Sequence, residues 1–202
     1  MLLAIDTSAG TDVAIVTPHG RVLAERRSAD TRHHAEAVGG AIAEVLADAG
    51  LSPQHISQVV GGMGPGPFTG LRVGVAAART FAFARGVRFI AMPSHDAAAH
   101  EWRAAHPEAA GDLLVTTDAR RGELACSRYE EGLLVASSCE LHRPDAVPDS
   151  ANRFDTRTIS AAHLALAWLD REIHGLEAEA NSIIYLRGAD AVPSNGPKRV
   201  TG

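Results

Sequence analysis

The sequence predicts an α/β fold in which a mixed sheet carries helices and the chain forms two lobes. Short apolar runs typical of strands alternate with longer segments at helical spacing, which is the pattern of α/β proteins. The hydrophobic content is 46% with only 4% aromatic residues, which suits a core of Ala, Val, Leu and Ile. A chain of 202 residues can form one large domain or two small lobes. Because the pattern breaks near His106, we expect a first lobe over residues 1–106 and a smaller one over residues 107–202.

The first lobe is predicted to begin with three short strands. An apolar run over residues 2–5 ends at Asp6, and two alternating segments flank a Pro18-His19-Gly20 turn. Apolar residues at helical spacing follow, and Thr69 and Ser94 stand where N-cap residues are expected. The elements expected after the first strand are strands over 12–17 and 21–27, a helix over 33–49, a strand over 56–63, a helix over 69–83, a strand over 88–92 and a helix over 94–105.

The second lobe is predicted to contain a hairpin and one long helix. Residues 143–157 carry two prolines and no clean periodicity, so we expect a loop there. Beyond residue 193 the sequence has the character of a frayed tail. The other expected elements are a strand over 113–117, a hairpin of 123–129 with 133–141, a helix over 160–173 and a final strand over 183–186.

The charge of the chain argues against a stand-alone RNA-binding protein. The net charge is −5, and the Lys and Arg residues are scattered along the chain. Because counterion release from phosphates requires clustered Lys and Arg, any RNA substrate is expected to be held mostly by another subunit.

The sequence also predicts a cytoplasmic protein that does not enter a membrane. The first residues, Met-Leu-Leu-Ala-Ile-Asp, lack the basic region and the long apolar region of a signal peptide. No apolar run approaches the roughly 20 residues that a membrane span needs. Cys126 and Cys139 do not form a C-x-x-C pair, and we expect two reduced thiols.

Two polar or glycine-rich segments are candidates for binding phosphate. Asp6-Thr7-Ser8 follows a buried strand and could hold a hydrated metal and phosphate oxygens, although an Asx turn is the simpler interpretation. Residues 61–70 form a glycine-proline loop that opens onto a helix N-terminus, where an anion can bind. No Lys-Ser/Thr pair follows, so it is not a Walker A loop, and a rigid strand-to-helix turn is an equal alternative. The candidate cofactor-binding residues are Asp6, Thr7, Ser8, Gly64, Gly66 and Thr69.

The helix predicted after this loop is apolar nearly all round. A helix of this kind must be covered on both sides, and in so small a chain the sheet covers one of them. The helix over 33–49 is expected beside it, and together the two helices are expected to present a patch to a partner. The alternative is complete burial within the monomer. The candidate interface residues are Val38, Ile42, Val45, Leu71, Arg72, Val75, Ala78 and Arg79.

No metal site and no catalytic residue is assigned. His100-Glu101 begins like the zinc-protease helix signature, but Ala104 stands where the second His is required. His95 and His100 are five residues apart and do not share a helix face, so solvated or capping histidines are expected. The segment from Asp118 to Glu123 either contacts a ligand between the lobes or forms a salt-bridged turn, and the residues do not decide between the two.

Several segments, in order, resemble the TsaB family. The most specific is residues 64–74, Gly-Pro-Gly-Pro-Phe-Thr-Gly-Leu-Arg-Val-Gly. The others are residues 3–8, the Arg32-x-His34-x-Glu36 pattern, residues 118–123 and the late Tyr185-Leu186-Arg187-x-x-Asp190. Two departures are Pro67, where the family often has Ser, and a short segment over 143–157.

The resemblance implies an actin-like ATPase or ribonuclease H-like two-lobed fold with a reduced second lobe. It implies a non-catalytic assembly or activating subunit, with no established enzyme activity of its own, that dimerises with a TsaD-like transferase for threonylcarbamoylation of tRNA adenosine (t6A). It also implies a TsaE-like ATPase as a third component, a homodimer when the chain is alone, and contact with tRNA through the complex. ATP or ADP with magnesium is expected only in that complex. The alternative function is an actin-like ATPase or small-molecule kinase that binds a nucleotide between the lobes.

Overall fold

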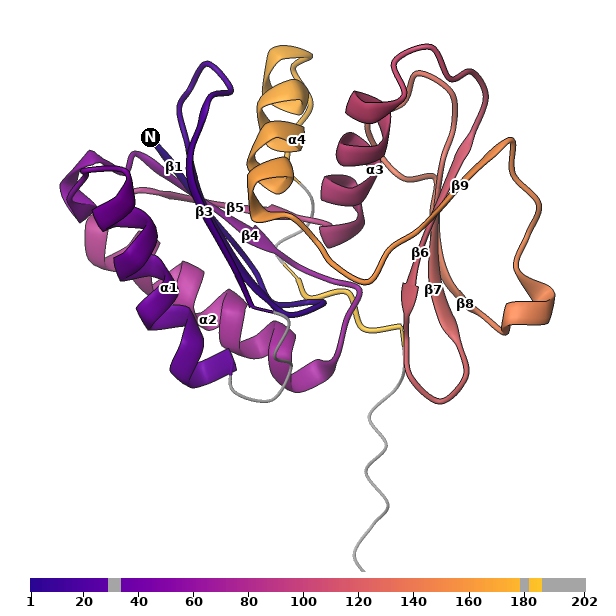
Figure 1. The fold of residues 1–202 in the computed structure, drawn as a ribbon, viewed down its shortest axis with the longest axis horizontal. Helices are drawn as coiled ribbons and strands as arrows, with labels where there is room; N and C mark the ends of the chain where they lie inside the picture. Colours follow the sequence, from indigo (N-terminus) through magenta and orange to yellow (C-terminus); the bar gives the residue numbers. More distant parts are fainter. Residues whose placement is uncertain (29–33, 179–181, 187–202) are drawn as a thin grey trace, which may run out of the picture.

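A five-stranded mixed sheet and a four-stranded mixed sheet form the framework of the molecule (Figure 1). The computed structural model describes residues 1–28, 34–178 and 182–186, with the side chains of residues 34–36 excepted. The first sheet has the order β3-β2-β1-β4-β5, in which β1 is antiparallel to β2 and parallel to β4. Its strands are β1 (Leu2–Asp6), β2 (Thr11–Val16), β3 (Val22–Ser28), β4 (Gln58–Gly62) and β5 (Arg88–Met92).

Helices cover both faces of the first sheet. Successive side chains of a strand point to opposite faces, and β1 is buried throughout. Leu3 and Ile5 pack in the cluster that includes side chains of α1 (His34–Asp48) and α2 (Phe68–Arg85). Leu2 and Ala4 pack in the cluster that includes side chains of α3 (Ser94–Ala105) and α4 (Ala161–Ile173). Figure 1 shows α1 and α2 on one side of the sheet and α4 on the other.

The second sheet has the order β8-β7-β6-β9 and lies beyond α3 (Figure 1). Its central strand β6 (Leu113–Asp118) pairs antiparallel with β7 (Leu124–Tyr129) and parallel with β9 (Asn152–Asp155). The outer strand β8 is Ser138–His142, and short 3-10 turns lie at Pro53–His55 and Pro144–Ala146. The predicted α/β class with mixed sheets is confirmed.

The division into two segments of sequence does not coincide with the packing. Helix α4 belongs to the half of the chain assigned to the second lobe, yet it packs against β1, β2 and β4 of the first sheet. Farther on, the Ile184 backbone N–H donates to the Met63 carbonyl at 2.8 Å, at the end of β4. Residues from the C-terminal half of the chain therefore pack against the first sheet.

Four local predictions are wrong. Thr69 is not an N-cap, because α2 begins at Phe68 with Pro67 at the cap position. Ser94 lies inside α3 and Pro93 takes its cap position. Residues 143–157 contain β9, and residues 183–186 form no strand. The other predicted elements are present to within a few residues, except that β8 begins only at Ser138. Ser160 caps α4 by accepting a hydrogen bond from the His163 N–H at 3.1 Å.

Both cysteines, Cys126 and Cys139, are free thiols, as predicted. None of the helices in the described part of the chain is long and apolar enough to cross a membrane. The Arg32-x-His34-x-Glu36 pattern and residues Arg187 and Asp190 fall outside the residues or side chains that the structure describes.

Candidate functional site

The turn Asp6-Thr7-Ser8 is buried and its polar groups bond to one another. It leaves β1 at the edge where β1 and the parallel strand β4 both end. The backbone N–H and the hydroxyl of Ser8 both donate to Oδ1 of Asp6, at 2.7 and 2.5 Å. These bonds form an Asx turn, which was the simpler of the two predicted interpretations.

Ser94 at the start of α3 connects this turn to the glycine-proline loop. Its hydroxyl donates to Oδ2 of Asp6 at 2.5 Å and accepts from the Gly64 N–H at 3.0 Å. On the other side, the Thr7 hydroxyl donates to the Gly70 carbonyl in α2 at 2.7 Å. Both oxygens of Asp6 therefore accept hydrogen bonds within the protein.

Three glycines allow the loop and α2 to lie directly on the turn. A Cβ at Gly62 would stand 1.8 Å from Asp6 Oδ2, one at Gly74 would stand 2.1 Å from Thr7 Oγ1, and one at Gly66 would stand 2.8 Å from the Ser8 Cα. Contacts this short mean that a side chain at any of these positions would force a neighbouring atom to move. Gly62 and Gly74 therefore leave room for the side chains of Asp6 and Thr7, and Gly66 leaves room for the backbone of Ser8.

Five of the six candidate cofactor residues come together here, and one does not. Asp6, Thr7, Ser8, Gly64 and Gly66 meet in the arrangement just described. Thr69 is exposed on the first turn of α2. In this arrangement the turn and the loop are hydrogen-bonded through Ser94, and each oxygen of the Asp6 carboxylate accepts a hydrogen bond from a serine hydroxyl.

An open cavity of about 920 Å³, here called the central cleft, lies on the other side of the glycine-proline loop. One wall is the loop with the first turns of α2, and the opposite wall is the turn that follows β6. Residues near the C-terminus complete it. The lining residues are Pro65, Gly66, Pro67, Phe68, Arg72, Thr117, Asp118, Ala119, Arg120, Arg121, Ala125, Leu141, Tyr185 and Leu186. Its volume falls in the range of about 300–1,000 Å³ that is typical of small-molecule sites.

Arg72 is held in place in this cleft by two aromatic rings. Its guanidinium lies 3.7 Å from the centre of the Phe68 ring, and its Nε donates to the Tyr185 hydroxyl at 3.0 Å. The two rings are 5.2 Å apart, centre to centre. Cation–π contact and the hydrogen bond together fix the orientation of the arginine.

The opposite wall is a turn in an unusual backbone conformation. Arg120 and Arg121 have φ angles of 65° and 57°, and Gly122 continues the left-handed run. The turn is closed by a hydrogen bond from the Arg120 N–H to Oδ1 of Asp118 at 2.8 Å. Left-handed backbone at a residue other than glycine costs on the order of 1 kcal/mol and is concentrated at functional sites. Residues 118–121 line the cleft, and Arg120 lies 4.0 Å from Asp118, so both predicted alternatives, contact with a ligand and a salt-bridged turn, stay predictions.

His95 contacts Thr117, one of the residues that line the cleft. The sequence analysis missed His95, because it predicted solvated or capping histidines. Its ring is fully buried on α3, with Nδ1 at 2.7 Å from the Ser127 hydroxyl and Nε2 at 2.8 Å from the Thr117 hydroxyl. Burial lowers the pKa of His95 to about 3, so the ring is neutral. His95 thereby ties α3 to strands β6 and β7, and Thr117 reaches the cleft.

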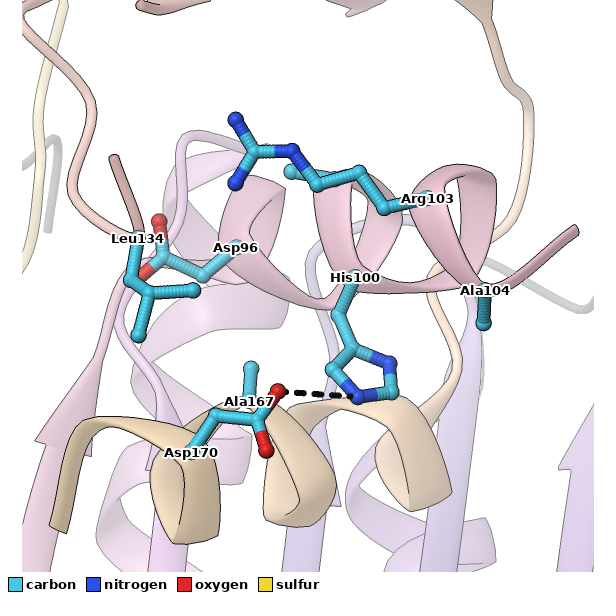
Figure 2. Close-up of a pocket in the computed structure, with 8 residues that line it drawn as sticks. Asp96, His100, Arg103, Ala104, Leu134, Ala167 and Asp170 are labelled. Atoms are coloured by element: carbon cyan, nitrogen blue, oxygen red, sulfur yellow. Dashed lines mark ion pairs between the residues drawn. The ribbon is translucent and has the colours of Figure 1, made fainter. Parts of the chain in front are cut away.

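A smaller cavity of about 240 Å³ lies between α3 and α4 (Figure 2). His100 on α3 points toward Asp170 on α4, and its Nε2 is 3.4 Å from Oδ2 of Asp170. Asp96, which also lines the cavity, pairs with the fully buried Arg171 and accepts a hydrogen bond from the Tyr129 hydroxyl at 2.8 Å. These contacts join the two helices to the second sheet. Within the described residues, no group of three or more His, Cys, Asp or Glu side chains is placed to hold a metal ion.

A cluster of charged side chains lies where β2 and β3 meet the N-terminus of α4. Glu25 accepts hydrogen bonds from the Ser160 hydroxyl at 2.7 Å and the Ala162 N–H at 3.1 Å. Asp12 is buried next to it, with Arg27 Nε at 2.7 Å from its Oδ2. Burial, and then the neighbouring Glu25, raise the pKa of Asp12 to about 8 against the opposing effect of Arg27.

The residues predicted for the partner interface need correction. Five of the eight are buried in the monomer, namely Val38, Val45, Leu71, Val75 and Ala78. They lie on the sides of α1 and α2 that face the first sheet and each other, so they cannot reach a partner. Ile42 is half-buried against the same core. Arg72 and Arg79 are exposed, but Arg72 belongs to the central cleft. The alternative of burial within the monomer holds for these apolar side chains.

Comparison with known proteins gives consistent matches over the chain. The family model described as TsaD, tRNA N6-adenosine threonylcarbamoyltransferase, matches residues 21–138. An uncharacterized protein of Mycobacterium tuberculosis (strain ATCC 25618 / H37Rv) is 34% identical over 205 residues, which cover 95% of this chain and 94% of the relative. The tRNA threonylcarbamoyladenosine biosynthesis protein TsaB of Bacillus subtilis (strain 168) is 33% identical over 135 residues, which cover 66% of this chain and 57% of that protein.

Solved structures match the fold over nearly its whole length. YeaZ from Pseudomonas aeruginosa has a TM-score of 0.72 at 23% identity, and the match covers 92% of this chain and 99% of that chain. A protein from the same source, described as similar to peptidase YEAZ, has a TM-score of 0.73 at 24% identity with the same coverage. At this level of identity the likeness concerns the fold.

Proposed function

Because this chain belongs to the TsaD family of tRNA N6-adenosine threonylcarbamoyltransferases and is a TsaB-like member of it, we propose that it serves in threonylcarbamoyladenosine (t6A) synthesis as a non-catalytic subunit. In this role it assembles with, and activates, a TsaD-like transferase. A TsaE-like ATPase joins the same complex, and tRNA meets the chain through its partners. The surface that carries this proposal is the outer side of α1 and α2.

This surface, here called the α1–α2 face, combines small residues with one large exposed ring. Its members are Gly40, Ala43, Ala47, Ala76, Thr80 and Phe83, all exposed. Phe83 is 88% exposed, and this single observation carries the proposal, because a phenylalanine held on a helix in water gains by being covered. Aromatic residues are enriched in protein interfaces, where they supply much of the binding energy.

The glycines of α1 support the same assignment. A Cβ built at Gly39 or Gly40 meets nothing within 4 Å, so packing inside the monomer does not require glycine there. Glycine inside a helix is destabilising by roughly 0.5–1 kcal/mol relative to alanine. Small side chains on an exposed helix instead allow another helix to approach closely. A TsaD-like subunit of the same family, or a second copy of this chain, would present such helices.

The alternative function, an ATPase or small-molecule kinase with ATP or ADP and magnesium on Asp6, is less well supported. Ser8 and Ser94 occupy both oxygens of Asp6, and Gly62 lies directly against the carboxylate. Magnesium at Asp6 would share the carboxylate with the hydroxyls of Ser8 and Ser94. We therefore keep a magnesium–nucleotide at this turn as a proposal for the assembled complex only.

The proposal is tested by mixing the purified chain with the TsaD-like transferase of the same organism and measuring mass by size-exclusion chromatography with light scattering. A single species with the mass of both chains supports the proposal, and the chain alone is expected to elute as a homodimer. Two unshifted peaks would count against the proposed assembly role. Calorimetry with ATP and magnesium on the chain alone tests the alternative.

A further inference from the structure

We propose that the cavity between α3 and α4 binds a small zwitterion of the α-amino acid class, with the ligand's carboxylate on Arg103 and its ammonium group on Asp170. This cavity lies apart from the central cleft and shares no lining residue with it. Binding here is independent of the proposed assembly role, since no residue of the α1–α2 face lines the cavity.

The size and the walls of the cavity suit a ligand of this class. Its volume of about 240 Å³ corresponds to about eight water molecules at about 30 Å³ each. Its apolar lining consists of Ala99, Ala104, Ala167 and Leu134. Sites for drug-sized ligands and cofactors are larger, at about 300–1,000 Å³, so the cavity favours a smaller molecule with a short apolar side chain.

The cation of the cavity is Arg103, whose guanidinium is held in place by two backbone carbonyls. Its Nη1 and Nη2 donate to the carbonyls of Leu133 at 2.6 Å and of Glu130 at 3.3 Å. In the part of the chain that the structure describes, no carboxylate forms an ion pair with it, and Asp96 is paired with Arg171 instead. Burial lowers the pKa of Arg103, because contacts within the chain compensate only part of the cost of removing this charge from water. An anion bound here would supply the rest.

The anion of the cavity is Asp170, on the facing helix α4. Its side chain is 45% exposed, and its Oδ2 lies 3.4 Å from Nε2 of His100. Burial, and then the neighbouring His163, lower the pKa of His100, so this ring is neutral at pH 7 and leaves the charge of Asp170 in place. Asp170 therefore accepts an ammonium group without giving up a charged partner.

Two histidines keep this carboxylate at the cavity. Nδ1 of His100 lies 2.8 Å from Nδ1 of His163, so one of the two atoms carries a proton and donates it to the other. When His163 is the donor, the proton of His100 is on Nε2 and faces Asp170, which makes both contacts attractive. The opposite arrangement would direct an unprotonated nitrogen at a carboxylate. The contacts therefore assign the first tautomer.

The two charges face each other across the cavity. In Figure 2, Arg103 extends from α3 and Asp170 from α4, and no ion pair joins these two side chains. A ligand with only a negative charge would be repelled by Asp170, and one with only a positive charge would be repelled by Arg103. A zwitterion satisfies both groups by charge-assisted hydrogen bonds, which are about twice as strong as neutral ones.

Calorimetry on the full chain at neutral pH, with L-valine, isovalerate and isobutylamine as separate probes, tests this site. Isovalerate is L-valine without its ammonium group, and isobutylamine is L-valine without its carboxylate. We expect L-valine to bind at least about tenfold more tightly than either, because each of them lacks one charge-assisted hydrogen bond. The proposal is overturned if L-valine does not bind at millimolar concentration, or if either of the other probes binds as tightly.

Two charge variants separate the contributions of the two groups. Arg103→Gln should weaken the binding of L-valine by about tenfold and should also weaken isovalerate, without weakening isobutylamine. Asp170→Asn should weaken L-valine and isobutylamine, without weakening isovalerate. Asp145→Asn, at an exposed position outside the cavity, should bind all three probes as the original chain does. Undiminished L-valine binding in both Arg103→Gln and Asp170→Asn would refute the assignment.

A matched pair of alanines on α3 tests the location without changing any charge. Ala104 is exposed and lines the cavity, whereas Ala105 is exposed and does not. Ala104→Leu should fill the cavity and weaken L-valine binding by at least about tenfold, and Ala105→Leu should leave it unchanged. Circular dichroism checks that both variants are folded. Equal L-valine binding by the two variants would place the ligand elsewhere and contradict the proposal.

Discussion

The hydroxyl of Ser94 donates a hydrogen bond of 2.5 Å to the carboxylate of Asp6, across 88 residues of sequence. Both side chains are buried, and Ser94 also accepts from the Gly64 N–H. Through these two hydrogen bonds, one serine connects the start of α3 to the end of β1 and to the glycine-proline loop. The Asp6-Thr7-Ser8 turn, which the sequence suggested as a phosphate site, joins three segments of this structure by hydrogen bonds.

Replacing Ser94 tests this fastening. Ser94→Ala would remove two buried hydrogen bonds, one to the Asp6 carboxylate and one from the Gly64 N–H, so we expect the free energy of unfolding to fall by about 2–3 kcal/mol. Ser138→Ala, at an exposed serine on β8, should change it by less than about 0.5 kcal/mol. Urea denaturation measures both, and similar small losses for the two variants would contradict the assignment.

Two glycines in helices should respond oppositely to alanine. Gly74→Ala places a Cβ 2.1 Å from Thr7 Oγ1, and we expect a loss of about 2 kcal/mol from overpacking. Gly39→Ala meets open space within α1 and should gain up to about 1 kcal/mol from helix propensity. Thermal and urea unfolding check the pair. If Gly74→Ala were as stable as Gly39→Ala, α2 would not rest on Thr7 as described.

His95 should make the protein sensitive to acid. Its pKa is about 3 in the folded state and about 6.5 when unfolded, so below pH 6.5 the unfolded state binds more protons and stability falls as pH decreases toward 3. The slope reaches at most about 1.4 kcal/mol per pH unit. His95→Gln should be less stable at pH 7 and should lose less between pH 6.5 and pH 4, as measured by urea denaturation. His19→Gln, on an exposed turn, controls for the loss of a histidine; an identical slope in His95→Gln and in the original chain would refute the account.

Asp12 should make the protein less stable as pH rises, which is opposite to the effect of His95. Its pKa is about 8 in the folded state against 3.8 for a free aspartate side chain, so between these values the folded state binds more protons and stability falls as pH rises. Asp12→Asn removes this effect. Relative to the original chain, the variant should gain stability progressively from pH 5 to pH 8, by at most about 1.4 kcal/mol per pH unit. Asp145→Asn, at an exposed position, serves as the comparison. A stability difference between Asp12→Asn and the original chain that stays constant across this range would show that Asp12 is ionised when folded.

Local patterns predicted most of the fold, and long-range packing accounts for the errors. The first three strands and all four helices follow from apolar periodicity. Strand β9 was missed because Asn152–Asp155 has one large apolar residue, Phe154, and its pairing with β6 is set by the sheet. Residues 183–186 have the composition of a strand but make one described backbone bond, to Met63.

The candidate site was predicted in part. The glycine-proline loop and residues 118–123 were both singled out in the sequence, and parts of both line one cleft in the structure. The contact of Arg72 with Tyr185 spans 113 residues, and nothing local predicts it. His95 stands between the polar residues Ser94 and Asp96 in α3, so only the packing of the second sheet shows that it is buried. The interface was misplaced because Leu71, Val75 and Ala78 recur at helical spacing, which equally describes the side of α2 that faces the core.

The central claim is that the α1–α2 face binds a TsaD-like transferase, and one pair of variants tests it most directly. Ala76 is exposed on α2 in the middle of this face, and Ala109 is exposed after α3, outside it. Light scattering after size-exclusion chromatography of each variant mixed with the transferase measures the complex. We predict that Ala76→Glu elutes as a separate folded chain while Ala109→Glu and the original chain form the complex. Complex formation by Ala76→Glu equal to that of Ala109→Glu would contradict the account.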